Sequence, residues 1–386
     1  MRKEWELRKI GECFSYIKNG ANIKQTKGAG GYPITRIETL SGGVFNRDRL
    51  GYADVVDLEQ YKDYILESGD LLVSHINSKT YIGRTVVYEG KQGENIIHGM
   101  NLLRLKHNRS LINSVFLCYY TQSVSFKLDI MRIRKDAVNQ SSFAISDFKK
   151  IRIPVPVLAT QISIVSELDK LNELIQIKKE QLKDYDALAQ SIFYEMFGDP
   201  VVNEKGWEMI SLSELSMYPN ERIAINQLSP SQYVGVENLI KDRGGVRFSN
   251  SLPKANSAIA YKENDILLGN IRPYLKKIWL ADKGGGASGD VVIIRISNRK
   301  ITPVFLFKVL SSDSFFEYDN TYTKGAKMPR GDRKAIAKFG VILPPLPLQQ
   351  SFAHKIEQIE RQKASVQKTI SDLEMLLAAR MQHWFD

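Results

Sequence analysis

Basic and amide side chains gather in two polar, loop-like stretches, and such side chains can bind phosphates or read the edges of bases. The stretches hold equivalent places, because Lys135 matches Lys324 at a shift of 189 residues. Arginine can donate two hydrogen bonds to guanine, asparagine and glutamine can read adenine, and lysine more often anchors a phosphate. The candidate contacts are Arg132, Arg134, Lys135, Asn139 and Gln140 in the first stretch, and Lys324, Lys327, Arg330 and Arg333 in the second. The side chains alone do not separate base readers from phosphate anchors.

A second basic group follows a predicted strand at residues 265–267. It contains Arg272, Lys276 and Lys277, and its counterpart in the first half contains Lys79 and Arg84. These five residues are further candidates for DNA contacts. The structural alternative is a basic surface that only keeps the protein in solution.

Motifs for catalysis, metals or phosphate loops are missing from the sequence. The five histidines and Cys13 and Cys118 show no metal-ligand spacing, so we expect ordinary reduced thiols and no metal. The glycine runs at 28–31 and 284–286 lack a following Gly-Lys-Ser/Thr, and we interpret them as flexible turns. Asn270 to Tyr274 resembles the Asn-Pro-Pro-Tyr of adenine methyltransferases only loosely, and no glycine-rich cofactor loop accompanies it. We therefore predict a chain without catalytic activity or a cofactor of its own.

Two stretches, 160–196 and 348–384, repeat one long helix at a shift of 188 residues. Steps of four and three residues trace an apolar seam on each copy, the 3.5-residue period by which two helices bury a shared stripe. The first seam is Ile164, Leu168, Leu171, Ile175, Lys178, Leu182, Tyr185, Ala189, Ile192 and Met196. The second is Phe352, Ile356, Ile359, Lys363, Val366, Ile370, Leu373, Leu377, Arg380 and Trp384. We expect the two helices to pack on each other.

The linkers predict how the helices run. Only about ten residues lie between the end of the first helix and Trp207, so the second globular segment should sit at the far end of that helix. The second helix must then run back, which makes the pair an antiparallel coiled coil. A helix of about 37 residues would be about 55 Å long. The duplication further implies a pseudo-twofold axis, with the C-terminus near the N-terminus.

The segments around the helices are also duplicated. Trp5-Glu6 recurs as Trp207-Glu208, Asp70-Leu71-Leu72 as Asp265-Ile266-Leu267, and Gln161 as Gln349. We predict two tandem α/β (α+β) domains at 1–157 and 201–347, separated by long helices at 158–200 and 348–386. The pattern further predicts strands at 291–296 and 102–105 and short helices at 111–120 and 302–310.

The positive charge lies in the globular segments. Residues 1–157 carry 24 basic and 16 acidic residues for +8, and residues 201–347 carry 21 and 14 for +7. The helical segments are −4 (158–200) and 0 (348–386). This layout is typical of two polyanion-binding domains on a neutral spacer. The alternative is a non-catalytic coiled-coil scaffold whose globular segments bind proteins.

No apolar run approaches the roughly 18 residues of a membrane helix, and the N-terminal residues lack the apolar core of a signal peptide. We therefore expect a cytoplasmic protein with no membrane partner.

The whole chain resembles the specificity subunits of type I restriction-modification systems. The residues that carry the resemblance are the two Trp-Glu starts, Gly69-Asp70-Leu71-Leu72 with Asn264-Asp265-Ile266-Leu267, the entry Ile153–Leu158 and the junction Met196–Val201 followed by Lys205-Gly206-Trp207. Ile342 departs from the pattern, because it stands where the first copy has Pro154.

The resemblance implies two target recognition domains, each reading one half of a split double-stranded DNA site, with the helices setting the spacer. It also implies docking of two modification (methyltransferase) subunits on the outward faces of the helices, with restriction (endonuclease and translocase) subunits joining them. S-adenosylmethionine, ATP and Mg²⁺ would be bound by those partners only.

Overall fold

The structure is a computed structural model that describes residues 5–26, 30–108, 110–138, 140–325 and 327–386. Its contacts separate the chain into two units. Unit 1 comprises the chain up to Lys179 together with Lys368–Asp386, and unit 2 is Glu180–Gln367. Each unit therefore contains a segment of both long helices, whereas the sequence analysis treated the helices as separate segments.

Head 1 is the globular part of unit 1, from β1 to β12. Its strands are β1 (Glu6–Lys9), β2 (Phe14–Asn19), β3 (Gln25–Thr26), β4 (Tyr32–Ile34), β5 (Gly51–Ala53), β6 (Leu71–Ser74), β7 (Ile76–Asn77), β8 (Thr85–Val87), β9 (Leu102–His107), β10 (Lys135–Asp136), β11 (Ser141–Ser142) and β12 (Arg152–Val155). Its helices are α1 (Ile10–Cys13), α2 (Ser114–Tyr120), α3 (Val124–Ile133) and α4 (Ile145–Phe148), with 3₁₀ turns η1 (Ile37–Gly43), η2 (Arg47–Arg49) and η3 (Glu59–Tyr64).

Head 2 is the globular part of unit 2, from β13 to β22. Its strands are β13 (Glu208–Ser211), β14 (Ser216–Met217), β15 (Arg222–Ala224), β16 (Tyr233–Val234), β17 (Ser257–Tyr261), β18 (Ile266–Gly269), β19 (Ile278–Leu280), β20 (Gly285–Ala287), β21 (Val291–Ile296) and β22 (Gly340–Leu343). Its helices are α6 (Leu212–Leu215), α7 (Pro303–Leu310), α8 (Asp313–Thr321) and α9 (Arg333–Ile336), with 3₁₀ turns η4 (Ile225–Gln227), η5 (Pro230–Gln232) and η6 (Pro273–Leu275).

Each head contains its own central antiparallel sheet, and the two sheets are equivalent. The strand order is β2-β9-β6-β8 in head 1 and β14-β21-β18-β19 in head 2. A second ribbon in each head joins its first and last strands, β1 with β12 and β13 with β22. The strands β6 and β18 are buried along their whole length and apolar except for Ser74, as expected for strands covered on both faces. Sheets paired in this way make each head α+β.

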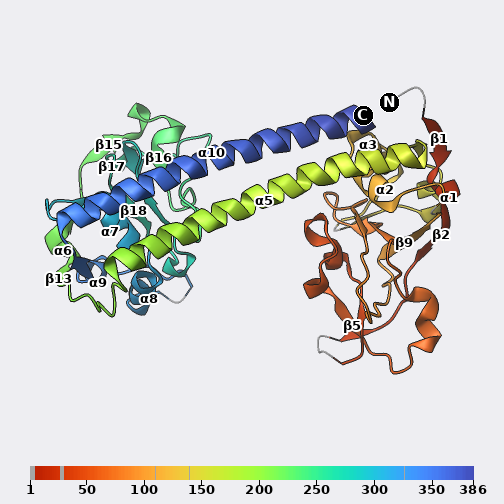
Figure 1. Cartoon of the computed structure of the whole chain (residues 1–386), viewed down its shortest axis with the longest axis horizontal. Coiled ribbons are helices and arrows are strands. Elements are labelled where there is room, and N and C mark those ends of the chain that lie inside the picture. Colours follow the sequence, from red (N-terminus) through yellow and green to blue (C-terminus); the bar gives the residue numbers. More distant parts are fainter. Residues whose placement is uncertain (1–4, 27–29, 109, 139, 326) are drawn as a thin grey trace. The chain divides into compact units, whose positions relative to one another are not determined.

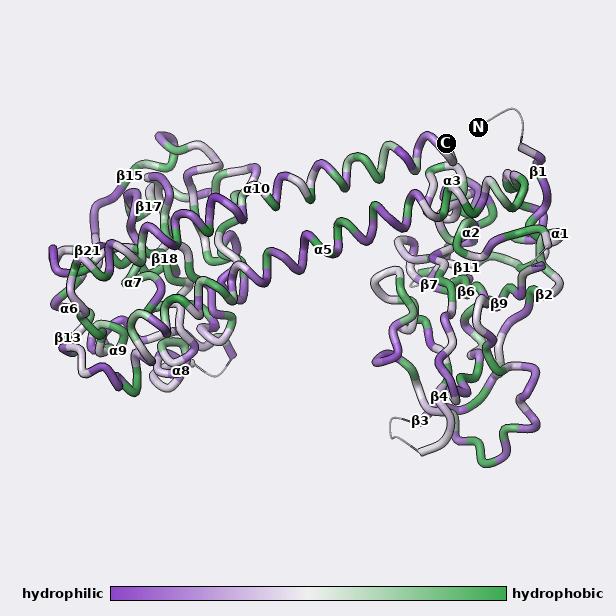
Figure 2. Tube along the Cα trace, in the orientation of Figure 1, coloured by the Kyte–Doolittle hydropathy of each residue, from purple (hydrophilic) through white to green (hydrophobic). Residues whose placement is uncertain are grey.

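The long helices are α5 (Leu158–Phe197) and α10 (Leu346–Phe385). Gly198, with φ +76°, ends α5 in the left-handed conformation that favours glycine at a helix C-terminus. The helix α10 begins two residues before the predicted segment because Pro347 is tolerated in a first helical turn. Figure 2 shows apolar turns recurring between polar turns along α5.

Within each unit the two helix segments run in opposite directions. In unit 1, Glu167 pairs with Arg380 while Lys179 pairs with Glu374 at 2.8 Å. In unit 2, Lys363 Nζ lies 2.8 Å from Asp186 Oδ1. The C-terminus ends beside α3, where the carboxylate of Asp386 accepts hydrogen bonds from the first backbone N–H groups of that helix (Figure 1).

A buried glutamine anchors the start of each long helix to its own head. Gln161 Oε1 accepts from Asn113 N at 2.8 Å, while its amide nitrogen donates to the carbonyls of Leu111 and Pro156. Gln349 makes the same three bonds, with Thr302 N and the carbonyls of Lys300 and Pro344. Both glutamines are 0% exposed, so each satisfies three backbone groups that water cannot reach.

The prediction of a flexible turn at residues 284–286 is wrong for two of its glycines. Gly285 and Gly286 lie in the buried strand β20. A Cβ on Gly285 would lie 2.1 Å from the carbonyl oxygen of Gln232, and one on Gly286 would lie 2.7 Å from Leu228. These glycines are therefore explained by close approach of neighbouring chain and not by turn geometry.

Candidate nucleic-acid interface

In head 1 a small three-stranded sheet brings the two predicted basic groups together. The order is β10-β11-β7, so the hairpin of β10 and β11 pairs with the strand that leads into the loop containing Lys79. Figure 2 shows β11 beside β7. Lys79 Nζ lies 3.1 Å and Arg134 Nε 2.8 Å from the carboxylate oxygens of Asp136. Donation from the Ser141 hydroxyl, followed by Lys79, lowers the pKa of the Asp136 carboxyl to about 2. Asp136 thus stays ionised and holds Lys79 and Arg134 at the β10 edge of this small sheet.

The remaining candidates of head 1 lie on α3, immediately before β8 and on the β10–β11 hairpin. Arg132 lies in the last turn of α3 and pairs with Asp129 at 2.7 Å, with its side chain 75% exposed. Arg84 lies over the ring of Tyr81, at 4.4 Å from the ring centroid. Lys135 and Gln140 are exposed. Asn139 lies outside the residues that the structure describes.

Head 2 contains the same ladder in a shorter form. Isolated backbone β-bridges pair Lys324 with Arg330 and Arg330 with Ile271. In head 1, Lys135 pairs with Ser142 and Ser142 with Ile76 in the same order. The backbone N–H of Arg272 donates to the carbonyl of Pro329 at 2.8 Å. We refer to this three-part arrangement in each head as the basic ladder.

Carboxylates also position the cations of the second basic ladder. Lys324 pairs with Asp332 at 2.5 Å, and Arg330 pairs with Asp290 at 3.0 Å while remaining half exposed. Arg333 donates to the carbonyl of Gly289 at 2.9 Å. Lys327 is exposed.

Lys276 and Lys277 are turned to other partners. Lys276 shares Asp313 with Arg243, at the start of α8. Lys277 Nζ donates to the carbonyl of Val236 at 2.7 Å, and burial lowers its pKa. Of the second basic group in head 2, only Arg272 therefore lies beside the ladder.

The predicted helix seam lies on the covered faces of the two helices. Eight of its twenty positions are buried: Ile164, Leu168, Ile175, Ala189, Phe352, Ile359, Val366 and Ile370. The others are partly buried: Leu171, Lys178, Leu182, Tyr185, Ile192, Met196, Ile356, Lys363, Leu373, Leu377, Arg380 and Trp384. The sequence reasoning missed Phe193, Phe197 and Phe385, which are almost fully buried where the helix ends enter the cores of the heads.

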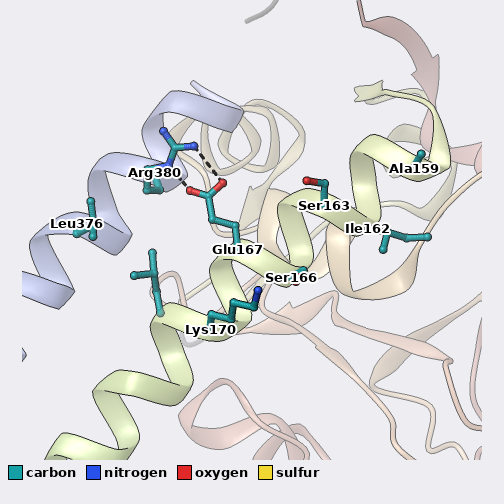
Figure 3. Close-up of a pocket in the computed structure, with 9 residues that line it drawn as sticks. Ala159, Ile162, Ser163, Ser166, Glu167, Lys170, Leu376 and Arg380 are labelled. Atoms are coloured by element: carbon teal, nitrogen blue, oxygen red, sulfur yellow. Dashed lines mark hydrogen bonds and ion pairs between the residues drawn. The ribbon is translucent and has the colours of Figure 1, made fainter.

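A groove of about 700 Å³ lies between α5 and α10 within unit 1 (Figure 3). Ile162 and Leu376 line it and are half exposed. Glu167 joins the helices there, because its carboxylate pairs with Arg380 and accepts from Trp384 Nε1 at 3.1 Å. An apolar groove closed by one ion pair can receive a further helix.

Metal and membrane features are absent from the described part of the chain. Among residues 5–26, 30–108, 110–138, 140–325 and 327–386, no cluster of three His, Cys, Asp or Glu side chains could hold a metal ion. No described helix combines the length and apolar character needed to cross a membrane. His354 and His383 are exposed on α10.

Sequence comparisons find similarity to restriction-modification proteins. A profile of the type I restriction modification DNA specificity domain matches residues 2–184. A putative type I restriction enzyme specificity subunit (MjaX) of Methanocaldococcus jannaschii is 29% identical over 381 residues, which cover 93% of this chain and 87% of that protein.

Two solved structures share the fold. The S subunit of a type I restriction-modification system from M. genitalium superposes with a TM-score of 0.58 at 14% identity, covering 99% of this chain and 96% of that one. A chain from a structure of a type I restriction-modification system gives the same TM-score and identity, covering 100% of this chain and 98% of that one.

Proposed function

Because the chain belongs to the family of type I restriction-modification specificity subunits, we propose that each of its heads reads one half of a split double-stranded DNA site. A specificity subunit supplies DNA recognition and no catalysis. The observation that carries the proposal is the basic ladder, which occurs once in each head and carries exposed cations, Lys135 in head 1 and Lys324 and Arg330 in head 2. Two DNA-reading heads on one chain imply a DNA site with two halves.

The long helices are proposed to set the spacer between the half-sites. They would do so as an antiparallel pair about a pseudo-twofold axis, which turns the two heads toward related faces of the duplex. The buried glutamines support this role, because each fixes the start of its helix to its own head through three hydrogen bonds. A rigid junction is needed if helix length is to determine spacing.

Two modification subunits are proposed to dock on the helices, and restriction subunits to join that complex. The groove beside Glu167 supports this docking, since Ile162 and Leu376 expose apolar surface there. S-adenosylmethionine, ATP and Mg²⁺ would then be bound by the partners, which would flip and methylate one adenine per half-site in the cytoplasm.

Single-molecule sequencing of adenine methylation tests the function directly. Cells would carry this chain with its modification subunit, and we expect one split motif with a methylated adenine in each half. Arg330→Ala should weaken methylation of that motif, whereas Arg299→Ala, an equal change of charge at an exposed loop residue, should not. A modification subunit that is active with another specificity chain but gives no split motif with this one would refute the proposal.

A further inference from the structure

Two exposed tyrosines occupy the same place in the two heads. Tyr81 lies four residues before Thr85, the first residue of β8, and Tyr274 lies four residues before Ile278, the first residue of β19. Tyr81 is 45% exposed and Tyr274 is 53% exposed. A lone exposed aromatic residue is common on protein surfaces. An exposed tyrosine at one position of both copies of a duplicated head has no explanation in the packing of either core.

Basic residues flank both tyrosines at equal distances along the chain. Lys79 and Arg272 stand two residues before them, and Arg84 and Lys277 stand three residues after. In head 1 the loop is tied to the basic ladder, because Lys79 pairs with Asp136 and the strand before it pairs with β11. The guanidinium of Arg84 over the Tyr81 ring keeps that ring beside positive charge.

In head 2 the loop is fixed from two sides. The backbone N–H of Arg272 is bound to Pro329 at the turn of the ladder. Arg272 and Lys276, with φ of 53° and 50°, bracket η6 in left-handed conformations that residues with side chains seldom adopt. Backbone N–H groups of the facing loop, from Asp242 and Arg243, donate to the carbonyls of Leu275 and Lys276 at 2.8 and 2.9 Å. Tyr274 is thus presented to solvent by a rigid turn.

We propose that Tyr81 and Tyr274 contact bases, one in each half-site, and so determine specificity alongside the charged residues. This inference rests on the proposed function. Lys79 and Arg272 can bind phosphates, as can a tyrosine hydroxyl, but the aromatic ring itself adds nothing to such a bond. A tyrosine ring can pack on a thymine methyl group, and its hydroxyl can bond a base edge. A ring held in place before binding also loses little conformational freedom on the DNA.

The first experiment reads the motif. Tyr81→Ala and Tyr274→Ala chains, each with the modification subunit, are compared with wild type by methylation sequencing in cells. We expect each variant to relax the sequence requirement at one or two positions of one half-site and to leave the other half-site unchanged. Each variant is thus the matched control of the other. An unchanged motif at unchanged methylation, or equal loss in both halves, would overturn the inference.

The second experiment separates base contact from phosphate contact. Duplexes carrying the mapped site are titrated with the full complex at several salt concentrations. Tyr274→Ala should weaken specific binding about tenfold, as for one base contact, with an unchanged salt slope, and Tyr274→Phe should retain most of the affinity. Arg330→Ala should instead reduce the slope by about 1.

Different results would refute the proposed function and the role of the tyrosines. If the wild-type complex shows no salt-dependent preference for any split site, the proposed function fails. If the wild type binds its site and Tyr274→Ala binds it equally well, only the role of the tyrosine fails.

Discussion

Asp70 and Asp265 immediately precede the central strands β6 and β18 and make equivalent ion pairs in the two heads. The carboxylate of Asp70 lies 2.7 Å from Arg104 Nε, and that of Asp265 lies 2.7 Å from Arg295 Nη2. Each carboxylate also accepts a backbone N–H from the preceding turn. The first pair is the better buried, with both side chains at most 4% exposed. Burial outweighs the arginine and raises the pKa of Asp70.

Asp70→Asn should therefore destabilise unit 1. The change removes the buried counter-charge of the Arg104 guanidinium and leaves only the exposed carboxylate of Glu67, at 3.6 Å, which costs about 3 kcal/mol. Trp5 and Trp384 lie in unit 1 and Trp207 and Trp279 in unit 2, so pairs of Trp→Phe changes allow each unit to be followed separately. Urea unfolding by fluorescence should show a lower midpoint for unit 1 alone. An equal shift of both units would show that the units do not unfold independently.

The buried titratable groups predict opposite responses of the two units to acid. Burial lowers the pKa of His75 to about 4 and of His98 to about 3 in unit 1, and raises that of Asp319 to about 6 in unit 2. Unfolded histidines take up protons as pH falls through about 6.5 while the folded ones do not, so unit 1 loses stability below that pH. Folded Asp319 takes up a proton near pH 6 and unfolded aspartate only near 3.9, so unit 2 gains stability over the same fall.

The same tryptophan reporters measure this response between pH 7 and pH 5. We expect the unfolding midpoint of unit 1 to decrease and that of unit 2 to increase. Asp319→Asn should abolish the increase, because the amide does not titrate. A rise in the stability of unit 1 on acidification would contradict the assignment of His75 and His98 as neutral buried groups.

At the scale of elements, the sequence predicts the long helices and several shorter elements well. The strand at 291–296 has the bounds of β21, and the helix at 302–310 matches α7 with Thr302 as its cap. The hydrophobic periodicity within each short stretch is enough to predict where these elements begin and end. The burial of Phe197 and Phe385 was missed because a 3.5-residue pattern drifts about 20° per heptad on a 3.6-residue helix, or about one residue position over this length.

The ladder residues were predicted only as candidates. Their grouping depends on pairing between segments far apart in the chain, such as Ile271 with Arg330, which no local pattern encodes. The sequence shows a basic residue two positions before both Tyr81 and Tyr274. Only the structure shows that both tyrosines are exposed to solvent. Lys276 and Lys277 show the converse, since nothing in the sequence indicates their bonds to Asp313 and Val236.

Insertion of four residues after Tyr185 should change the spacer of the DNA site or abolish its recognition without unfolding either head. Four residues add about 6 Å and turn the following helix about 40° beyond a full turn, which moves the seam off its partner face. Seven residues inserted at the same place add two nearly complete turns and keep the seam facing its partner. Methylation sequencing reads the spacer, and tryptophan fluorescence reports the fold of the heads. Methylation of the original site by the four-residue variant would refute the role of the helices.

At the scale of the whole molecule, exchange of residues 1–150 for those of another specificity subunit should change one half-site only. Each head has its own central sheet and its own ladder, so reading is expected to be independent. The donor must supply an aromatic residue at position 5, because the ring of Trp5 stacks on Trp384 of the retained helix. The reciprocal exchange of head 2 is the control. Changes in both half-sites after a single exchange would refute independence.

The duplication and the order of segments could be predicted from the sequence, because repeated landmarks need no structure to be recognised. Which residues make up each structural unit could not be predicted from the sequence. Whether Lys368–Asp386 belongs with the first or the second head depends on contacts across more than 200 residues, such as Glu167 with Arg380.

The burial of Phe385 determines the order in which the protein can fold during synthesis. This residue is 0% exposed, and its ring lies 5.5 Å from that of Phe116 and 5.9 Å from that of Tyr120. Head 1 leaves the ribosome first, yet its core lacks this side chain until residue 385 has been made. Head 2 has both of its helix segments by residue 367 and can finish earlier. Only a chain translated through Phe385 therefore has a complete first head, so a chain that stops before this residue would carry a defective core in the head that was made first.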